Sequence, residues 1–265
     1  MIANLPTPYH DAREVGEVSV KLPTPIRGWR VLAGEMGVIV VSVLIALGAQ
    51  QLVERREWNQ RAKASDEAIK EELGTAAAFS YERRVIQPCL QGKIRELATK
   101  LVDNHGAWIA SPMKVASAQY LNVIPPAYRA PSRTFIWDAW TTAMADGTVN
   151  HMPAARVQQY SALYNSVEHM AQLQEQEQSA GASLAPLSYD GQLDDRTRVE
   201  MIARLAEVDR INSLMALIGG QIIDALRELK FGYDKSEVAT GVKGILDEQR
   251  VIRGTCVTPA PLDLG

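Results

Sequence analysis

Cys89 and Cys256 are the only two cysteines in the chain, and their thiols can form one disulfide bond. Cys89 opens a predicted helix and Cys256 lies in a predicted C-terminal tail, so a bond would tie this tail to the helical domain. Closing a loop of this length stabilises a fold by about 2–5 kcal/mol in the chain-entropy view. Such a bond requires an oxidising compartment such as the periplasm. We favour the disulfide over the alternative, two unrelated free thiols.

The histidines are spread along the chain, and no two of them lie within four residues of each other: His10, His105, His151 and His169. The sequence therefore contains no helical pair of metal ligands. His151 and His169 can still converge in the fold with Glu168 or Asp146, although such residues more commonly cap helices or lie on the surface. We predict no metal ion and no cofactor.

Trp137, Asp138 and Trp140 are candidates for the floor of a pocket with one polar group. The alternative is two core aromatic side chains beside an exposed aspartate. Among catalytic patterns only Ser-x-x-Lys occurs, from Ser111 to Lys114. Its companion motifs are missing and it lies in a proline-rich loop, so we interpret it as a chance match.

No GxSxG, HExxH, P-loop or GxGxxG pattern occurs in the sequence. We therefore predict a non-enzymatic protein. One alternative is an enzyme without a known motif that uses His151, Glu168, His169 or Asp138. Another is a sensor that binds a small apolar ligand between helices.

The composition is that of a globular protein. Of the 265 residues, 46% are hydrophobic and 22% are charged, which excludes a disordered or collagen-like chain. The net charge of −3 gives no basic excess, so no nucleic-acid partner is predicted. Two cysteines are too few for a disulfide-framework mini-protein or a four-cysteine zinc site.

One segment departs from this average, because the 23 residues from Val31 to Val53 contain a single charged residue, Glu35. A helix of this length is about 35 Å long and can span a hydrocarbon core of about 30 Å. We predict a transmembrane helix over residues 29–53, with the lipid bilayer as a partner. The alternative is a cleaved signal peptide, but cleavage near Gly48 would remove far more than the usual length of about 15–30 residues.

Polar and small residues in this segment are candidates for a role within the membrane. Glu35 is a carboxylate at membrane depth, although its place near the helix N-terminus, where the dipole favours an anion, gives a structural explanation. Small residues recur at a spacing that lets two helices approach closely: Ala33 and Gly37, then Ser42 and Ala46. We predict a protein partner or a homo-oligomer formed through this helix.

Basic residues are nearly balanced on the two sides of the span, so charge alone does not set its orientation. Residues 1–28 form a predicted flexible, proline-containing tail, which is the easier end to leave in the cytoplasm. We therefore predict a single-pass protein of the inner membrane whose C-terminal domain is periplasmic.

The sequence after the span predicts an all-α domain over residues 54–250 and a C-terminal tail over residues 251–265. Apolar residues recur there at spacings of three and four, and no alternating pattern predicts strands. The simplest architecture is a bundle of antiparallel helices continuous with the membrane helix. The predicted helices are 54–85, 89–102, a helix from Ser132 or Thr134 to Gly147, 153–180, 194–229 and 236–249.

Individual residues mark breaks in this pattern. We expect Pro88 to interrupt the first helix and residues 111–132 to form a loop with a short helix in its middle. Gly219 and Gly220 mark either a kink or a close contact between helices. The glutamine-rich run at 172–178 is predicted to form a solvated face or the end of a helix.

Two runs, GEMGVIVVSVLIALGAQQLVERREWNQRAK and IWDAWTTAMADGTVNHMPAARVQQYSALYN, resemble an uncharacterised family of single-pass proteins of Gram-negative bacteria. That family has a Gly-Glu-aliphatic membrane helix that runs into a charged helix, and then an aromatic pair before a Tyr-containing helix. The resemblance covers roughly residues 29–175, and the long N-terminal tail departs from it. It implies an architecture and a location, and no chemistry.

Together these patterns predict a membrane-anchored helical protein that acts as a scaffold, assembly factor or partner-binding protein of the cell envelope. Because the membrane helix continues into the domain, partner binding outside the membrane would bias helix pairing within it.

Overall fold

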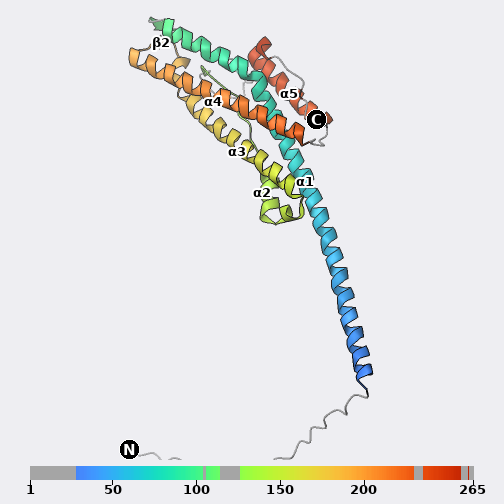
Figure 1. The fold of residues 1–265 in the computed structure, drawn as a ribbon. Coiled ribbons are helices and arrows are strands. Elements are labelled where there is room, and N and C mark those ends of the chain that lie inside the picture. Colours follow the sequence, from blue (N-terminus) through green and yellow to red (C-terminus); the bar gives the residue numbers. More distant parts are fainter. Residues whose placement is uncertain (1–27, 104–105, 114–125, 230–234, 258–261, 263–265) are drawn as a thin grey trace, which may run out of the picture. The chain divides into compact units, whose positions relative to one another are not determined.

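The computed structural model describes residues 28–103, 106–113, 126–229, 235–257 and 262. Residues 1–27 of the predicted tail and the short helix expected in the middle of 111–132 lie outside this part of the chain. The chain divides into two compact units, residues 1–54 and 55–265. The described residues confirm the all-α class, since apart from one two-stranded pairing their regular elements are helices (Figure 1).

The described residues of the first unit belong to the opening part of α1 (Trp29–Asp103), a helix of 75 residues. An 18-residue window of this helix has a mean hydropathy of 2.3, and none of that window is buried. The Ser42 hydroxyl donates a hydrogen bond to the Val38 carbonyl at 2.8 Å, so its polarity is satisfied within the helix. The helix is long and apolar enough to cross a membrane.

The second unit contains the rest of α1 together with α2 (Asp138–Ala145), α3 (Ala154–Ala182), α4 (Asp195–Glu228) and α5 (Lys235–Arg253). Three short 3₁₀ helices connect or extend them: η1 (Thr148–His151), η2 (Ala185–Ser188) and η3 (Gly254–Cys256). Figure 1 shows α3 and α4 running antiparallel to each other. The last helix reaches Arg253, so α5 includes the first residues of the expected C-terminal tail.

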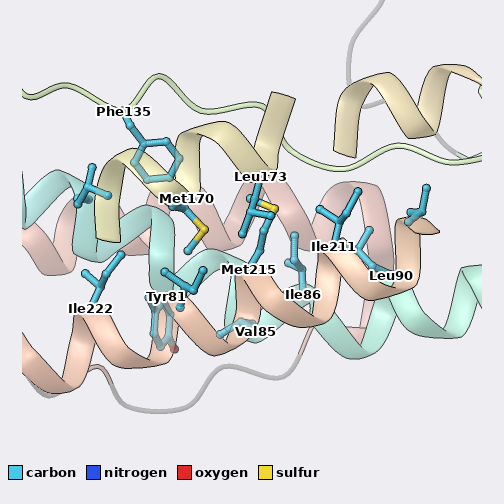
Figure 2. Close-up of a cluster of buried hydrophobic side chains, with 14 of the residues drawn as sticks. Tyr81, Val85, Ile86, Leu90, Phe135, Met170, Leu173, Ile211, Met215 and Ile222 are labelled. Atoms are coloured by element: carbon cyan, nitrogen blue, oxygen red, sulfur yellow. The ribbon is translucent and has the colours of Figure 1, made fainter. Parts of the chain in front are cut away.

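The core of the second unit lies between α1, α3 and α4. Figure 2 shows Ile86 and Leu90 of α1, Met170 of α3, and Ile211 and Met215 of α4 meeting in one cluster. The spacing of three and four in the sequence predicts this, because residues so spaced share one face of a helix. The buried residues of α3 and α4 follow this spacing, although Val199 and Leu217 of the apolar pattern in α4 are exposed.

Gly219 lies where α4 packs closely against α1 and α3. A Cβ atom at this position would meet the Ser80 carbonyl oxygen of α1 at 3.0 Å and the Met170 methyl carbon of α3 at 3.3 Å. The neighbouring Gly220 would meet nothing within 4 Å. The sequence left a kink or a close helix contact open for the Gly-Gly pair, and Gly219 makes the close contact.

Pro88 lies inside α1 and does not end it, so the predicted interruption is wrong. A proline lacks the N–H group of the helical hydrogen bond, and its ring crowds the carbonyl of the residue four positions earlier, which bends a helix. Figure 1 shows α1 changing direction in its teal part. Helix continues because apolar residues on both sides of Pro88 are buried, among them Ile86 and Leu90.

The helix expected to begin at Ser132 or Thr134 begins at Asp138, so that predicted start is also wrong. The Gln174 side chain of α3 exchanges two hydrogen bonds of 2.8 Å with the backbone of Arg133, which holds this segment outside any helix. The N-terminus of α2 is capped by a residue of another helix, since Glu72 of α1 accepts a hydrogen bond from the Ala139 N–H at 2.8 Å. Gly147 closes the helix as expected, with φ at +79°.

The end of α1 meets the start of α4 beside a small sheet that the sequence did not predict. β1 (Ala107–Trp108) pairs antiparallel with β2 (Gly191–Gln192). The buried Arg198 donates hydrogen bonds to the Leu101 and Gly106 carbonyls, which suits the negative end of the α1 dipole. At the start of α4, the Asp194 carboxylate accepts the Thr197 N–H at 2.6 Å and so caps the helix.

Candidate functional site

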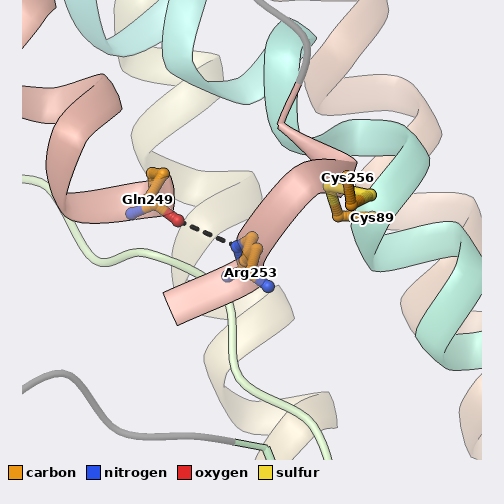
Figure 3. The surroundings of a disulfide bond; sticks show 4 residues. All are labelled: Cys89, Gln249, Arg253 and Cys256. Carbon is orange, nitrogen blue, oxygen red and sulfur yellow. Dashed lines mark hydrogen bonds between the residues drawn. A yellow bond between two sulfur atoms is a disulfide. The ribbon is translucent and has the colours of Figure 1, made fainter. Parts of the chain in front are cut away.

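Cys89 and Cys256 are joined by a disulfide in the described structure, with their Cα atoms 5.6 Å apart (Figure 3). Cys89 lies in α1, one residue after Pro88, and Cys256 ends η3 after α5. The bond links positions 167 residues apart in the sequence. It therefore fastens the end of α5 to the first helix of the second unit.

Two adjacent residues of α1, Glu82 and Arg83, begin two separate ionic networks. Glu82 is fully buried, and its carboxylate accepts two hydrogen bonds from the Arg133 guanidinium at 2.7 and 2.8 Å. It also accepts one from Gln249 of α5 at 2.9 Å. Arg133 in turn contacts Glu248 of α5 at 2.8 Å. This network joins α1 to α5 through the segment that precedes α2.

The second network crosses the interior in another direction. The Arg83 guanidinium is paired with the Glu177 carboxylate of α3, and both side chains are buried. The Tyr128 hydroxyl donates to the other Glu177 oxygen at 2.8 Å. Burial, reinforced by the Glu177 charge, raises the pKa of Tyr128 well above its ordinary value. Both oxygens of Glu82 and of Glu177 accept hydrogen bonds. Because the donors come from other elements of the chain, the two networks hold those elements together.

Arg253 extends the Glu82 network to the C-terminal end of α5. Its guanidinium donates to the Gln249 side chain at 2.8 Å and to the Arg129 carbonyl at 3.0 Å (Figure 3). Burial lowers the pKa of Arg253 to about 10, and the nearby Arg83 charge adds to this effect. The disulfide and the Glu82 network thus hold α5 on α1, and the Arg253–Arg129 bond ties α5 to the segment that precedes α2.

A tyrosine cluster occupies the interface of α1, α2 and α3. Tyr160 donates to Asp66 at 2.6 Å and Tyr164 donates to Glu72 at 2.7 Å. Trp140 stacks on the Tyr164 ring at 5.6 Å and meets the Tyr160 ring edge-on at 6.4 Å. Burial, helped by the Asp66 hydrogen bond, raises the pKa of Tyr160 to about 12. Burial and Glu72 also raise the pKa of Tyr164.

A groove of about 260 Å³ lies beside this cluster, between α1 and the segment that leads into α2. Its floor is apolar, with Ala76 and Phe135 buried, and its rim is exposed. The predicted pocket residues Trp137, Asp138 and Trp140 do not line it, although their neighbours do. The lining residues are Ala68, Glu71, Glu72, Thr75, Ala76, Phe79, Phe135, Ile136 and Ala139.

The candidate catalytic residues lie on the surface of the described structure. His151 stacks on Trp58 with ring centroids 4.2 Å apart. Glu168, His169 and Asp138 are exposed. Within the described ranges, no group of three or more His, Cys, Asp or Glu side chains is placed to hold a metal ion. His10, His105 and Lys114 of the Ser-x-x-Lys match lie outside those ranges.

The membrane-segment candidates are Ala33, Glu35, Gly37, Ser42 and Ala46, and all of their side chains are exposed along α1. A Cβ atom at Gly37 would meet nothing within 4 Å. The first unit therefore presents its small residues on an open helix surface.

Sequence analysis missed the buried networks. The run 172–178 was expected to be solvated or to end a helix, and its other polar residues are exposed, but Gln174 and Glu177 are buried within α3. The available signal was the position of these residues on the helix. Gln174 follows the buried Leu173, and Glu177 lies four residues after Leu173, so both lie close to the buried face. In α1, the pair Glu82-Arg83 interrupts an apolar run in the same way.

Comparisons of this chain with protein-family models, with curated proteins and with solved structures give no match.

Proposed function

We propose that this chain is a single-pass protein of the inner membrane whose helical domain binds a protein partner in the periplasm, as a non-enzymatic scaffold or assembly factor. The observation that carries the proposal is the exposed apolar window of α1, within a helix that continues to Asp103. Exposed apolar surface on this scale is unfavourable in water and favourable in a bilayer.

The disulfide supports the periplasmic location. A bond between Cys89 and Cys256 persists in oxidising compartments and is reduced in the cytoplasm. A periplasmic second unit leaves the short N-terminal end in the cytoplasm.

The chemistry of the second unit supports partner binding over catalysis. Its buried carboxylates, Glu82 and Glu177, accept hydrogen bonds on both oxygens, and those bonds join separate elements. Its open groove combines an apolar floor with exposed edges, as binding surfaces do.

Within the membrane, the proposal includes pairing of the helix with a second helix. Ala33 and Gly37, and then Ser42 and Ala46, offer the small-residue spacing for close approach. Glu35 lies near the start of the span, where its carboxylate can reach the polar headgroups. A reporter assay of association in membranes tests this part, with Gly37→Ile expected to reduce dimer or heteromer formation.

The first experiment is thiol labelling of the full chain in acid-quenched cells, with and without reduction, combined with alkaline washing of membranes. We expect the chain to stay in the washed membranes and both cysteines to resist alkylation until they are reduced. Release from membranes by the wash would overturn the anchor, and free alkylation of both thiols would overturn the periplasmic location.

The binding role is tested by chemical crosslinking of the full chain in native membranes. We expect discrete heteromeric products. Only monomers and random aggregates across a range of crosslinker lengths would overturn the binding role.

A further inference from the structure

The groove beside α2 is a surface depression with a distinct chemical character. Ala76 and Phe135 form its buried floor and Phe79 is partly buried, while Glu71 and Ile136 stand exposed at its edge. At about 260 Å³ it is smaller than the usual 300–1,000 Å³ or so of pockets that enclose a drug-sized molecule. A depression of this size, open at its edge, suits one or two side chains of a docked polypeptide better than a free ligand.

The charged residues that line the groove are both acidic, and the Arg133 guanidinium that lies 5.8 Å from the Phe79 ring is already paired with Glu82 and Glu248. The lining of the groove contains two carboxylates, Glu71 and Glu72, and no lysine, arginine or histidine. Glu72 accepts hydrogen bonds from two neutral donors, the Ala139 N–H and the Tyr164 hydroxyl, so these partners leave its charge uncompensated. Among the described residues, no cation forms an ion pair with Glu71. An incoming cation therefore finds two carboxylates beside an apolar floor.

We propose that this groove docks a segment of a partner protein that presents a lysine or arginine side chain next to an apolar side chain. The apolar side chain contacts Phe79 and Phe135, and the cation pairs with Glu71 at the rim. The inference rests on the proposed partner-binding function and specifies the partner's chemistry. Charge complementarity of this kind sets specificity and the rate of association.

The test is photocrosslinking of the full chain in native membranes, with a benzophenone amino acid in place of Ile136. A second variant carries the same amino acid in place of Val199, an exposed position of α4. The crosslinked peptide is then sequenced by mass spectrometry. We expect a product from position 136 whose peptide contains lysine or arginine beside an aliphatic or aromatic residue.

Charge reversal supplies the matched comparison. Glu71→Lys is expected to lower the yield from position 136 by about fivefold or more, because attraction at the rim becomes repulsion. Glu200→Lys, a reversal at an exposed position of α4, is expected to leave the yield within about twofold, since that charge is not part of the groove. Protection of Cys89 and Cys256 from alkylation in both variants shows that they fold.

The outcomes separate the two proposals. Crosslinks at Val199 or by chemical reagents, with none at position 136, overturn the groove and leave partner binding standing. A product at 136 that is lipid, a second copy of this chain or a segment without a cation also overturns it, as does a yield that Glu71→Lys leaves unchanged. Absence of any protein product from every position overturns the partner-binding function and the groove with it.

Discussion

At the scale of single residues, the interior contains an ion pair that is buried on both sides. Arg83 has 3% of its surface exposed and pairs with Glu177, which has 1% exposed. Among the described residues, two of the three guanidinium nitrogens of Arg83, Nε and Nη1, have no hydrogen-bond partner. Removing one charge of such a pair destabilises the fold more than removing both charges, because the remaining charge stays buried and uncompensated.

Arg83→Met is expected to lower the free energy of unfolding by about 3–5 kcal/mol, because Glu177 is left buried with the Tyr128 hydroxyl as its remaining hydrogen-bond donor among the described residues. The measurement is urea denaturation of the full chain in detergent, followed by far-ultraviolet circular dichroism. The double variant Arg83→Met, Glu177→Gln removes both charges and is expected to lose less than the single variant. Equal or greater loss in the double variant would contradict this account of the pair.

Three tyrosines are expected to ionise late in the folded protein, because burial raises the pKa values of Tyr128, Tyr160 and Tyr164. Ordinary tyrosines ionise near pH 10, whereas Tyr160 has a pKa of about 12. A raised folded-state pKa stabilises the fold fully below about pH 10, and this stability is lost as the pH rises toward the folded value.

Absorbance at 295 nm across an alkaline titration measures this. The folded chain is expected to show a late component above about pH 11 that is missing in denaturant. Tyr160→Phe should reduce that component, while Tyr189→Phe, at an exposed position, should leave it in place. A single transition near pH 10 for the folded chain would show that these hydroxyls are not protected.

At the scale of elements, Gly219 sets how closely α4 approaches α1. Gly219→Ala is expected to destabilise the bundle by about 1–3 kcal/mol, because the new methyl group lies 3.0 Å from a backbone oxygen that cannot rotate away. Gly220→Ala is the matched control, since it meets open space. It is expected to be neutral or to stabilise the helix by up to about 1 kcal/mol. Thermal unfolding of both variants checks the pair, and equal melting temperatures would contradict the close contact.

Elements with a long apolar stripe were predictable from sequence. Helix α3 begins after Pro153 and buries residues such as Leu163 and Val167, as the spacing requires. The Asp194 cap of α4 was also predictable, because short acidic side chains satisfy the first N–H groups of a helix.

Features that depend on distant partners were not predictable. The start of α2 is set by Glu72, which lies 67 residues away in sequence. Gln174 holds the backbone of Arg133 from another helix, and no local signal at Ser132 or Thr134 reports that. The groove was missed for the same reason, because its floor combines Ala76 of α1 with Phe135. The pairing of Cys89 with Cys256 was foreseen, since two cysteines allow one intramolecular bond.

At the scale of the whole molecule, the disulfide joins the interior of α1 to the turn that follows α5. Cys89→Ser or Cys256→Ser is expected to lower the free energy of unfolding by about 2–4 kcal/mol, because the unfolded chain regains the freedom of a long loop. The Glu82 network and Arg253 are expected to keep α5 docked in these variants. Hydrogen exchange measured by mass spectrometry checks this. Amide exchange in the variants is expected to be faster than in the wild-type chain, and the increase is expected to be larger in α5 than in the other helices.

Reduction of the wild-type chain is the control, and it should reproduce the loss of stability that the serine variants show. Those variants should not respond to reductant. A reductant effect of equal size in the variants would mean that the stability difference comes from elsewhere in the assay.

The bond between Cys89 and Cys256 also gives the polypeptide a circular stretch. Residues 89–256 form a covalent ring, and residues 1–88, including the apolar part of α1, form a stem attached to it. A protease that cuts the ring once opens it and releases nothing, whereas a single cut in the stem between the apolar part and Cys89 frees the whole ring. In an oxidising compartment, separation of this domain from the apolar segment is therefore decided within α1.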